Sequence, residues 1–166
     1  DLRKSKILWK GTKMRGMGKH EGEINLKSGW ISLQEGLLNG GRFEIDMASI
    51  TVTDIPKSDP IPIKNLTDHL KSEDFFDAAH YPISRFELLE SKNLEHHEVE
   101  ITGNLTIKGI TNQIRFVSKY DKTHISARFT LNRFNWNIAY ECSMVDRTLL
   151  VRDVEFEIKF VHTNSI

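Results

Sequence analysis

The chain has 166 residues, and Lys plus Arg and Asp plus Glu each count 23, so its formal net charge is zero. This length is typical of one domain, and we predict a single domain over residues 1–166. The balanced charge, without a basic tract, argues against a nucleic-acid partner. No apolar run of about 18 residues occurs, so no transmembrane segment is predicted. The single cysteine, Cys142, lies between Tyr140 and Met144 and is interpreted as a core thiol.

The first part of the chain carries several short strand signals. Ile7 and Trp9 indicate a first strand, residues 18–26 a second and residues 30–33 a third. Residues 43–52 alternate between apolar and polar side chains, but the parity shifts midway, as it does at a β-bulge. Such a shift marks a bend of the sheet, which a closing barrel needs.

One segment has helical instead of alternating spacing. Three prolines precede it, and apolar residues then recur at i, i+3 and i+7 within residues 63–72. Ser72 and the two acidic residues after it predict the N-cap of a second helical turn that holds Phe75 and Phe76. We therefore expect a helical insert that covers one end of the β structure.

The strongest strand signal is the alternation over residues 99–108. Gly109 follows, and residues 114–120 resume the alternation on the other parity. These two segments predict a hairpin whose polar loop lies around Thr111 and Asn112.

Three further strands complete the set. Residues 85–89 and 154–160 are strand-like, and residues 125–131 alternate before the parity shifts to Phe134 and Trp136, which we interpret as a second bulge. About eight to nine strands at short intervals are typical of sandwiches and barrels. We predict an all-β, mostly antiparallel barrel with a short helical insert at one end.

The residues expected to face the barrel interior are bulky and apolar. A solid core is the more frequent arrangement of such residues, and a cavity for an apolar molecule is the alternative, with Gly22 and Gly103 relieving crowding along the walls. Periodicity does not separate the two. The inward set is Phe43, Ile45, Met47, Phe86, Leu88, Ile101, Leu105, Ile107, Phe116, Phe129, Leu131, Phe156, Ile158 and Phe160.

Chemistry-bearing motifs are weak. His20, His69 and His80 lie in or near the insert region, but no HxH, HxxxH or HExxH spacing joins them, so no metal site is predicted. The pair at 96–97 is interpreted as a solvated loop, and the acidic residues of the insert as helix-terminus and solvent-facing charges. Neither a G-x-S-x-G elbow nor a phosphate-binding glycine loop occurs. No catalytic residue and no cofactor are predicted.

Four motifs follow one another over most of the chain: HEG at 20–22, FEIDMASI at 43–50, HLKSEDFFD at 69–77 followed by Tyr81-Pro82 and Phe86, and GNLTIKGIT at 103–111. In this order they resemble the motifs of the YceI-like family. Near the C-terminus the family often has R-x-x-F-G, where this chain has Arg133-Phe134-Asn135-Trp136-Asn137.

The resemblance implies a lipocalin-like, eight-stranded antiparallel barrel with helices at its mouth. It also implies binding, sequestration or transport of a long apolar chain, such as a polyisoprenoid, an isoprenoid quinone or a fatty-acid amide, by a non-enzymatic protein. Family members are typically bacterial and periplasmic, so the chain is expected to be a mature, exported form whose signal peptide has been removed. Homodimer formation stays open.

Within that interpretation, Leu70, Phe75 and Phe76 are expected to cover the mouth, while the inward set lines the interior. His20, His69 and Trp136 are candidates for contacting a polar head, and Trp136 is also expected to shorten or reshape the cavity. One alternative is a hydrolase or other enzyme on an apolar substrate, using His20 or His69 with a carboxylate or a metal. A purely structural or stress-induced partner domain with a filled core is another.

Overall fold

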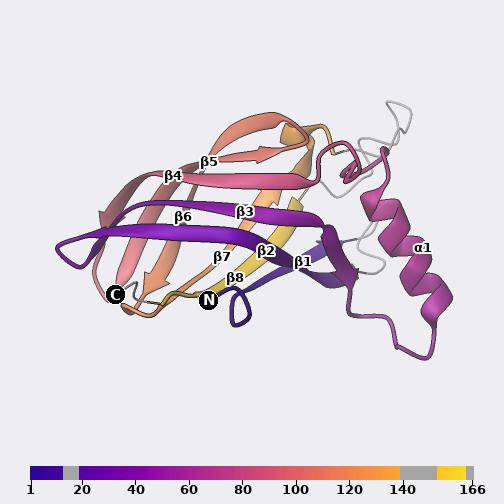
Figure 1. Cartoon of the computed structure of the whole chain (residues 1–166), viewed down its shortest axis with the longest axis horizontal. Helices are drawn as coiled ribbons and strands as arrows, with labels where there is room; N and C mark the ends of the chain where they lie inside the picture. Colours follow the sequence, from indigo (N-terminus) through magenta and orange to yellow (C-terminus); the bar gives the residue numbers. More distant parts are fainter. Residues whose placement is uncertain (13–18, 139–152, 164–166) are drawn as a thin grey trace.

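A computed structural model describes residues 1–12, 19–138 and 153–163, where eight antiparallel strands form a closed barrel (Figure 1). Each strand pairs with its neighbours in the chain, and β1 pairs with β8 to close the barrel. The predicted all-β barrel is confirmed, while Cys142 lies outside the described residues. The strands are β1 (Lys6–Thr12), β2 (Lys19–Gln34), β3 (Leu37–Val52), β4 (Ile83–Asn93), β5 (Glu98–Ile107), β6 (Ile110–Tyr120), β7 (His124–Asn132) and β8 (Asp153–Val161).

The second strand is longer than predicted. Residues 18–26 and 30–33 were expected to form two strands, but they belong to the one 16-residue strand β2, so the barrel has eight strands. The predicted parity shift in β3 is confirmed, because the register with β2 jumps there. The Ser49 hydroxyl accepts a hydrogen bond from the Asn25 amide (2.8 Å) and donates one to the Asp46 carbonyl (2.6 Å). These bonds satisfy backbone groups that the interrupted ladder leaves unpaired.

The β5–β6 turn is tighter than the predicted loop around Thr111 and Asn112. Those two residues lie in β6, opposite Thr106 and Leu105. The turn is made by Lys108 and Gly109, both at positive φ (50° and 73°). A two-residue hairpin turn with this geometry matches the twist of the flanking strands and favours glycine. Because the turn is complete at Gly109, the polar residues that follow belong to the strand.

The predicted second bulge is wrong. β7 ends at Asn132, and the chain continues as a short 3-10 helix, η2 (Arg133–Trp136). The Asn132 side chain accepts a hydrogen bond from the Phe134 amide (3.1 Å) and so caps the first turn of η2. Asn137 ends η2 in the left-handed conformation (φ 53°), which Asn tolerates better than most residues. The parity shift toward Trp136 therefore marks the end of a strand.

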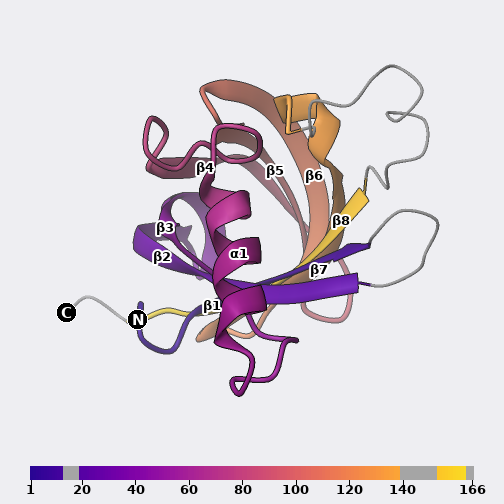
Figure 2. The ribbon, with the colours of Figure 1, turned by 90° about the vertical axis from the view of Figure 1, so that its right-hand side faces the viewer.

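One helix, α1 (Pro60–Lys71), crosses the end of the barrel at which β3 ends and β4 begins (Figures 1 and 2). It starts before the predicted range because the first turn of a helix tolerates proline, whose missing N–H has no partner there anyway. The predicted second helical turn is wrong. Ser72 is the C-cap of α1, and its hydroxyl donates to the His69 carbonyl (2.7 Å). Hydrogen-bonded turns follow, with Phe75 N–H donating to the Ser72 carbonyl (3.0 Å).

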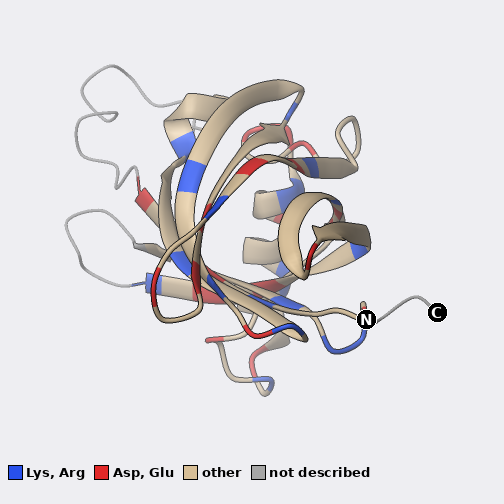
Figure 3. Ribbon diagram, turned by 90° about the vertical axis from the view of Figure 1, so that its left-hand side faces the viewer, with Lys and Arg blue, Asp and Glu red and all other residues tan. Residues whose placement is uncertain are grey.

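Positive and negative residues are interspersed along the strands (Figure 3). Arg85 donates to Glu44 (3.0 Å), and Arg128 donates to Glu157 (2.9 Å), in both cases between neighbouring strands. No helix among the described residues is long and apolar enough to cross a bilayer. The apolar side chains gather inside the barrel.

The β6–β7 turn contains an acidic group with a lowered pKa. The Asp121 carboxylate accepts hydrogen bonds from the backbone amides of Thr123 (3.1 Å) and His124 (2.8 Å) and from the Thr123 hydroxyl (3.0 Å). The two backbone hydrogen bonds, followed by that hydroxyl, lower the Asp121 pKa from 3.8 to about 2. Because the folded pKa is depressed, this stabilisation is complete above the unfolded pKa and is lost as the pH falls through about 2.

An NMR titration of carboxyl carbons should therefore show Asp121 with a midpoint near 2. Asp121→Asn should remove that resonance and make the loss of stability between the unfolded pKa and pH 2 less steep. A midpoint at the ordinary value of 3.8 would contradict the assignment.

Candidate functional site

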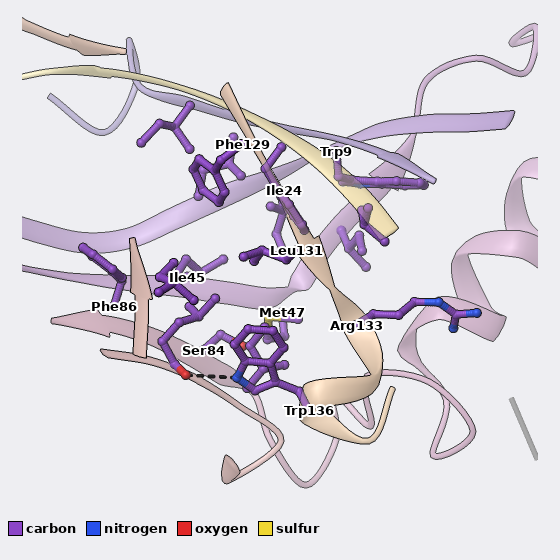
Figure 4. A pocket seen from close by; sticks show the side chains of 18 of the residues that line it. Trp9, Ile24, Ile45, Met47, Ser84, Phe86, Phe129, Leu131, Arg133 and Trp136 are labelled. Carbon is purple, nitrogen blue, oxygen red and sulfur yellow. Dashed lines mark hydrogen bonds between the residues drawn. The ribbon is translucent and has the colours of Figure 1, made fainter. Parts of the chain in front are cut away.

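The barrel encloses a cavity of about 290 Å³. All eight strands contribute to its walls, and side chains of α1 and of the turns that follow it line it as well. The lining is almost entirely aliphatic and aromatic (Figure 4). The interior is therefore hollow, and of the two arrangements left open by the sequence the structure has the cavity.

A row of phenylalanine rings runs around the interior across five of the strands. The rings of Phe116 and Phe129 stack with centroids 4.5 Å apart, and Phe86 and Phe156 extend the row at 5.8 and 6.0 Å on either side. Phe43 continues it beyond Phe86 at 6.5 Å. Stacked and tilted contacts of this kind are favourable beyond the area they bury. They hold the rings in place around the cavity.

Glycines allow aromatic rings to lie flat on the barrel wall. Gly22 is the register partner of Trp9, and a Cβ on Gly22 would lie 2.4 Å from the Trp9 ring. A Cβ on Gly103 would lie 2.3 Å from Cζ of Phe86. Any side chain at these positions would push the ring toward the cavity, so the glycines keep space open, as the sequence suggested for Gly22 and Gly103.

The wall between β6 and β7 is closed by side chains more than by backbone pairing. The two strands pair only over residues 118–120 and 125–127 among the described residues, so they separate toward α1. Phe116 and Phe129 stack across this separation. Nearer the mouth, η2 packs against β6, and the Trp136 indole N–H donates to the Leu105 carbonyl (3.0 Å). Trp136 is 1% exposed and forms part of the cavity wall (Figure 4).

The mouth is apolar on one side and charged on the other. Leu66 and Leu70 of α1 line the cavity together with Phe75 and Phe76. The Arg133 guanidinium lies 5.3 Å from the Phe75 ring centroid and donates to the Ile138 carbonyl (3.0 Å). Its side chain points out of the cavity toward α1 (Figure 4). A cation–π contact and a hydrogen bond hold the guanidinium in place at the rim of the site.

Two histidines near the mouth are paired with carboxylates. Nδ1 of His20, which borders the cavity, lies 3.0 Å from Oδ2 of Asp54. Nδ1 of His80 lies 2.8 Å from Oδ1 of Asp77, and this hydrogen bond raises the His80 pKa. Glu73 joins that pair, with one potential ligand atom of each of the three residues within 4.8 Å of the others. His80 and Asp77 form an ion pair, and the charge of Glu73 adds to the rise of the His80 pKa.

The comparisons with known proteins agree with the fold. The YceI-like domain model matches residues 1–162. The chain belongs to the YceI-like family.

Two relatives from Staphylococcus aureus, the UPF0312 proteins SA2479 and SAV2687, are each 34% identical over 119 residues, covering 64% of this chain and 67% of theirs. Among solved structures, Burkholderia cenocepacia BcnA matches with a TM-score of 0.78 at 21% identity, covering 98% of this chain and 99% of that one. A polyisoprenoid binding domain from Saccharophagus degradans matches with a TM-score of 0.66 at 13% identity, covering 96% and 93%. These structures share the YceI-like barrel.

Nearly all residues predicted to line the YceI-like barrel border the cavity. The whole inward set does, as do Leu70, Phe75, Phe76, His20 and Trp136. His69 does not; it lies in the last turn of α1, and its ring centroid is 5.9 Å from that of Phe75. Ligand contact by any of these residues stays a prediction.

Sequence reasoning missed several lining residues. Ser84 has the parity of Phe86 and Leu88, and a strand started one residue before Arg85 would have included it on the inward face. The sequence predicts a strand at Trp9, and its spacing from Ile7 indicates that the two side chains share a face. The predicted inward set leaves both out, although both line the cavity. Arg133 directly follows the end of β7, where the sequence predicts a bulge, so strand alternation does not predict on which face its side chain lies.

Proposed function

We propose that this protein binds a long apolar chain inside the barrel and sequesters or transports it, without chemical change to the ligand. The observation that carries the proposal is the enclosed apolar cavity, whose walls are kept open by glycine–aromatic pairs at Gly22 and Gly103. Burying an aliphatic chain there gains roughly 25 cal/mol for each Å² removed from water, and few polar contacts are needed. A polyisoprenoid, an isoprenoid quinone and a fatty-acid amide all present such a chain.

Family membership supports the same function. The Saccharophagus degradans domain with the same fold is described as polyisoprenoid binding. The cavity has no group of nucleophile, base and orienting residue among the described side chains that line it. These observations favour a binding protein over an enzyme that uses His20 or His69.

Native mass spectrometry and solvent extraction of the purified protein test the proposal. We expect a co-purified or added polyprenol or quinone to remain bound and to be recovered with its mass unchanged. Recovery of a shortened or hydrolysed chain would indicate an enzyme. Failure to retain any lipid from several hosts, together with failure to take up a quinone or a prenol, would contradict the proposed function.

Filling the cavity should abolish binding. Ile45 points into the cavity, so Ile45→Trp is expected to weaken uptake of the fluorescent apolar probe N-phenyl-1-naphthylamine by about tenfold or more, since ligand and indole compete for the same space. Val117 lies on the outer face of β6, and Val117→Trp is the matched control that should bind as the wild type does. Equal binding by both variants would show that the probe sits elsewhere.

We also propose that the protein acts after export, in the periplasm, because members of the family it belongs to are typically periplasmic. Fractionation of cells that express the full-length gene product tests this, with recovery in the periplasmic fraction as the expected result. Retention in the cytoplasm would contradict it.

A further inference from the structure

Two polar groups in the otherwise apolar cavity have no hydrogen-bond partner within the described part of the chain. The first is the hydroxyl of Ser84, which is 4% exposed and lines the cavity near the start of β4. The second is the indole Nε1 of Trp9 on β1, which is 9% exposed. Arg85 Nε is also buried without a partner, but Arg85 does not line the cavity. Buried polar groups are nearly always paired, so the indole N–H of Trp9 needs a partner, and the Ser84 hydroxyl lines the same cavity.

A buried hydroxyl elsewhere in the barrel and a second buried indole that borders the cavity show the usual arrangement. Ser118 is 1% exposed, and its hydroxyl donates to the Val99 carbonyl (3.2 Å). Trp136 donates to the Leu105 carbonyl. Trp136 borders the cavity as Trp9 does, so the fold is able to pair a buried indole there, and it leaves the indole N–H of Trp9 unpaired.

We infer that Ser84 and Trp9 hold the polar head of the ligand, and that this head carries an uncharged acceptor oxygen such as a carbonyl. The inference rests on the proposed function and specifies the ligand it takes. The Trp9 indole can only donate through its N–H, so its missing partner is an acceptor, and the Ser84 hydroxyl is able to donate to a group of the same kind. Ser84 and Trp9 lie on different walls of the barrel (Figure 4).

The charge of the head follows from the surroundings. An ionised head buried among apolar walls would lose its hydration without gaining a counter-ion, which costs far more than a neutral carbonyl does. Arg133 lies at the rim and points toward α1, and Asp153 borders the cavity as well, so the rim combines opposite charges. A neutral head at Ser84 with its chain among the phenylalanine rings satisfies both the polar and the apolar parts of the site.

A matched pair of probes isolates the head. Heptadecane and heptadecan-2-one are titrated as competitors of N-phenyl-1-naphthylamine, and the quantity measured is the ratio of the two affinities. In Ser84→Ala the preference for the ketone should fall about tenfold, the value of one buried hydrogen bond, while heptadecane affinity stays within about twofold. Trp9→Phe keeps a ring over Gly22 and should also lower the ratio. Ser118→Ala is the control and should leave it unchanged.

The possible outcomes distinguish failure of the head-group inference from failure of the proposed function. If neither heptadecane nor heptadecan-2-one competes and the fluorescent probe itself does not bind, the proposed function fails. If both compete but the ratio is the same in wild type, Ser84→Ala and Trp9→Phe, the function stands and the inference is overturned. It is likewise overturned if palmitate binds more tightly than the ketone and loses affinity in Arg133→Gln but not in Ser84→Ala, because the head would then be recognised by charge at the rim.

Discussion

Gly22→Ala is expected to lower the free energy of unfolding by about 3 kcal/mol, at the upper end of the cost of overpacking. The added Cβ would lie 1.9 Å from the Thr51 carbonyl oxygen and 2.4 Å from the Trp9 ring. The backbone contact leaves no room for a rotamer change, so β2 must move away from β3. Thermal unfolding should show the melting temperature falling by about 10 °C for a chain of this size.

Gly11→Ala is the matched control. Gly11 lies in the neighbouring strand β1, and a Cβ there would meet nothing within 4 Å. The same substitution should leave stability unchanged or raise it slightly, because alanine restricts the unfolded chain. A loss in Gly11→Ala as large as that in Gly22→Ala would mean that strand conformation, and not the contact with Trp9 and Thr51, makes glycine necessary.

Alternation predicted the inward set because side chains of a strand alternate between two faces. The positions of Phe43, Phe86, Phe116 and Phe129 could be assigned without a structure for this reason. Periodicity could not distinguish a filled barrel from a hollow one. That depends on ring orientation, which is set by a contact between neighbouring strands such as that of Gly103 with Phe86.

The errors cluster where the chain leaves a strand. Phe134 and Trp136 have the spacing of a bulge, but the Asn132 side chain caps a helical turn there and Asn137 ends it. The family pattern R-x-x-F-G places a glycine where this chain has Asn137, and Asn137 adopts the left-handed conformation that glycine adopts readily. Asn137 thus adopts a backbone conformation that is also open to glycine, and Trp136 forms part of the cavity wall.

Trp136→Phe is expected to cost about 2 kcal/mol more stability than Trp9→Phe, a difference of about 6 °C in melting temperature. Both substitutions remove the same atoms from a buried indole. The Trp136 N–H donates to the Leu105 carbonyl (3.0 Å), so its loss breaks a buried hydrogen bond. The Trp9 N–H has no partner in the described chain, so its loss removes an unsatisfied donor.

The position of Trp136 adds a second, local effect. Because β6 and β7, as far as the structure describes them, pair only over residues 118–120 and 125–127, side chains join these two strands toward the mouth. A smaller ring at Trp136 should therefore speed hydrogen exchange of the amides of Ile114 and Phe116 in Trp136→Phe, whereas Trp9→Phe should not. Comparable losses of stability in the two variants would show that the indole N–H of Trp9 is satisfied in solution without ligand. Ser84 would then be the one residue left to hold the polar head of the ligand.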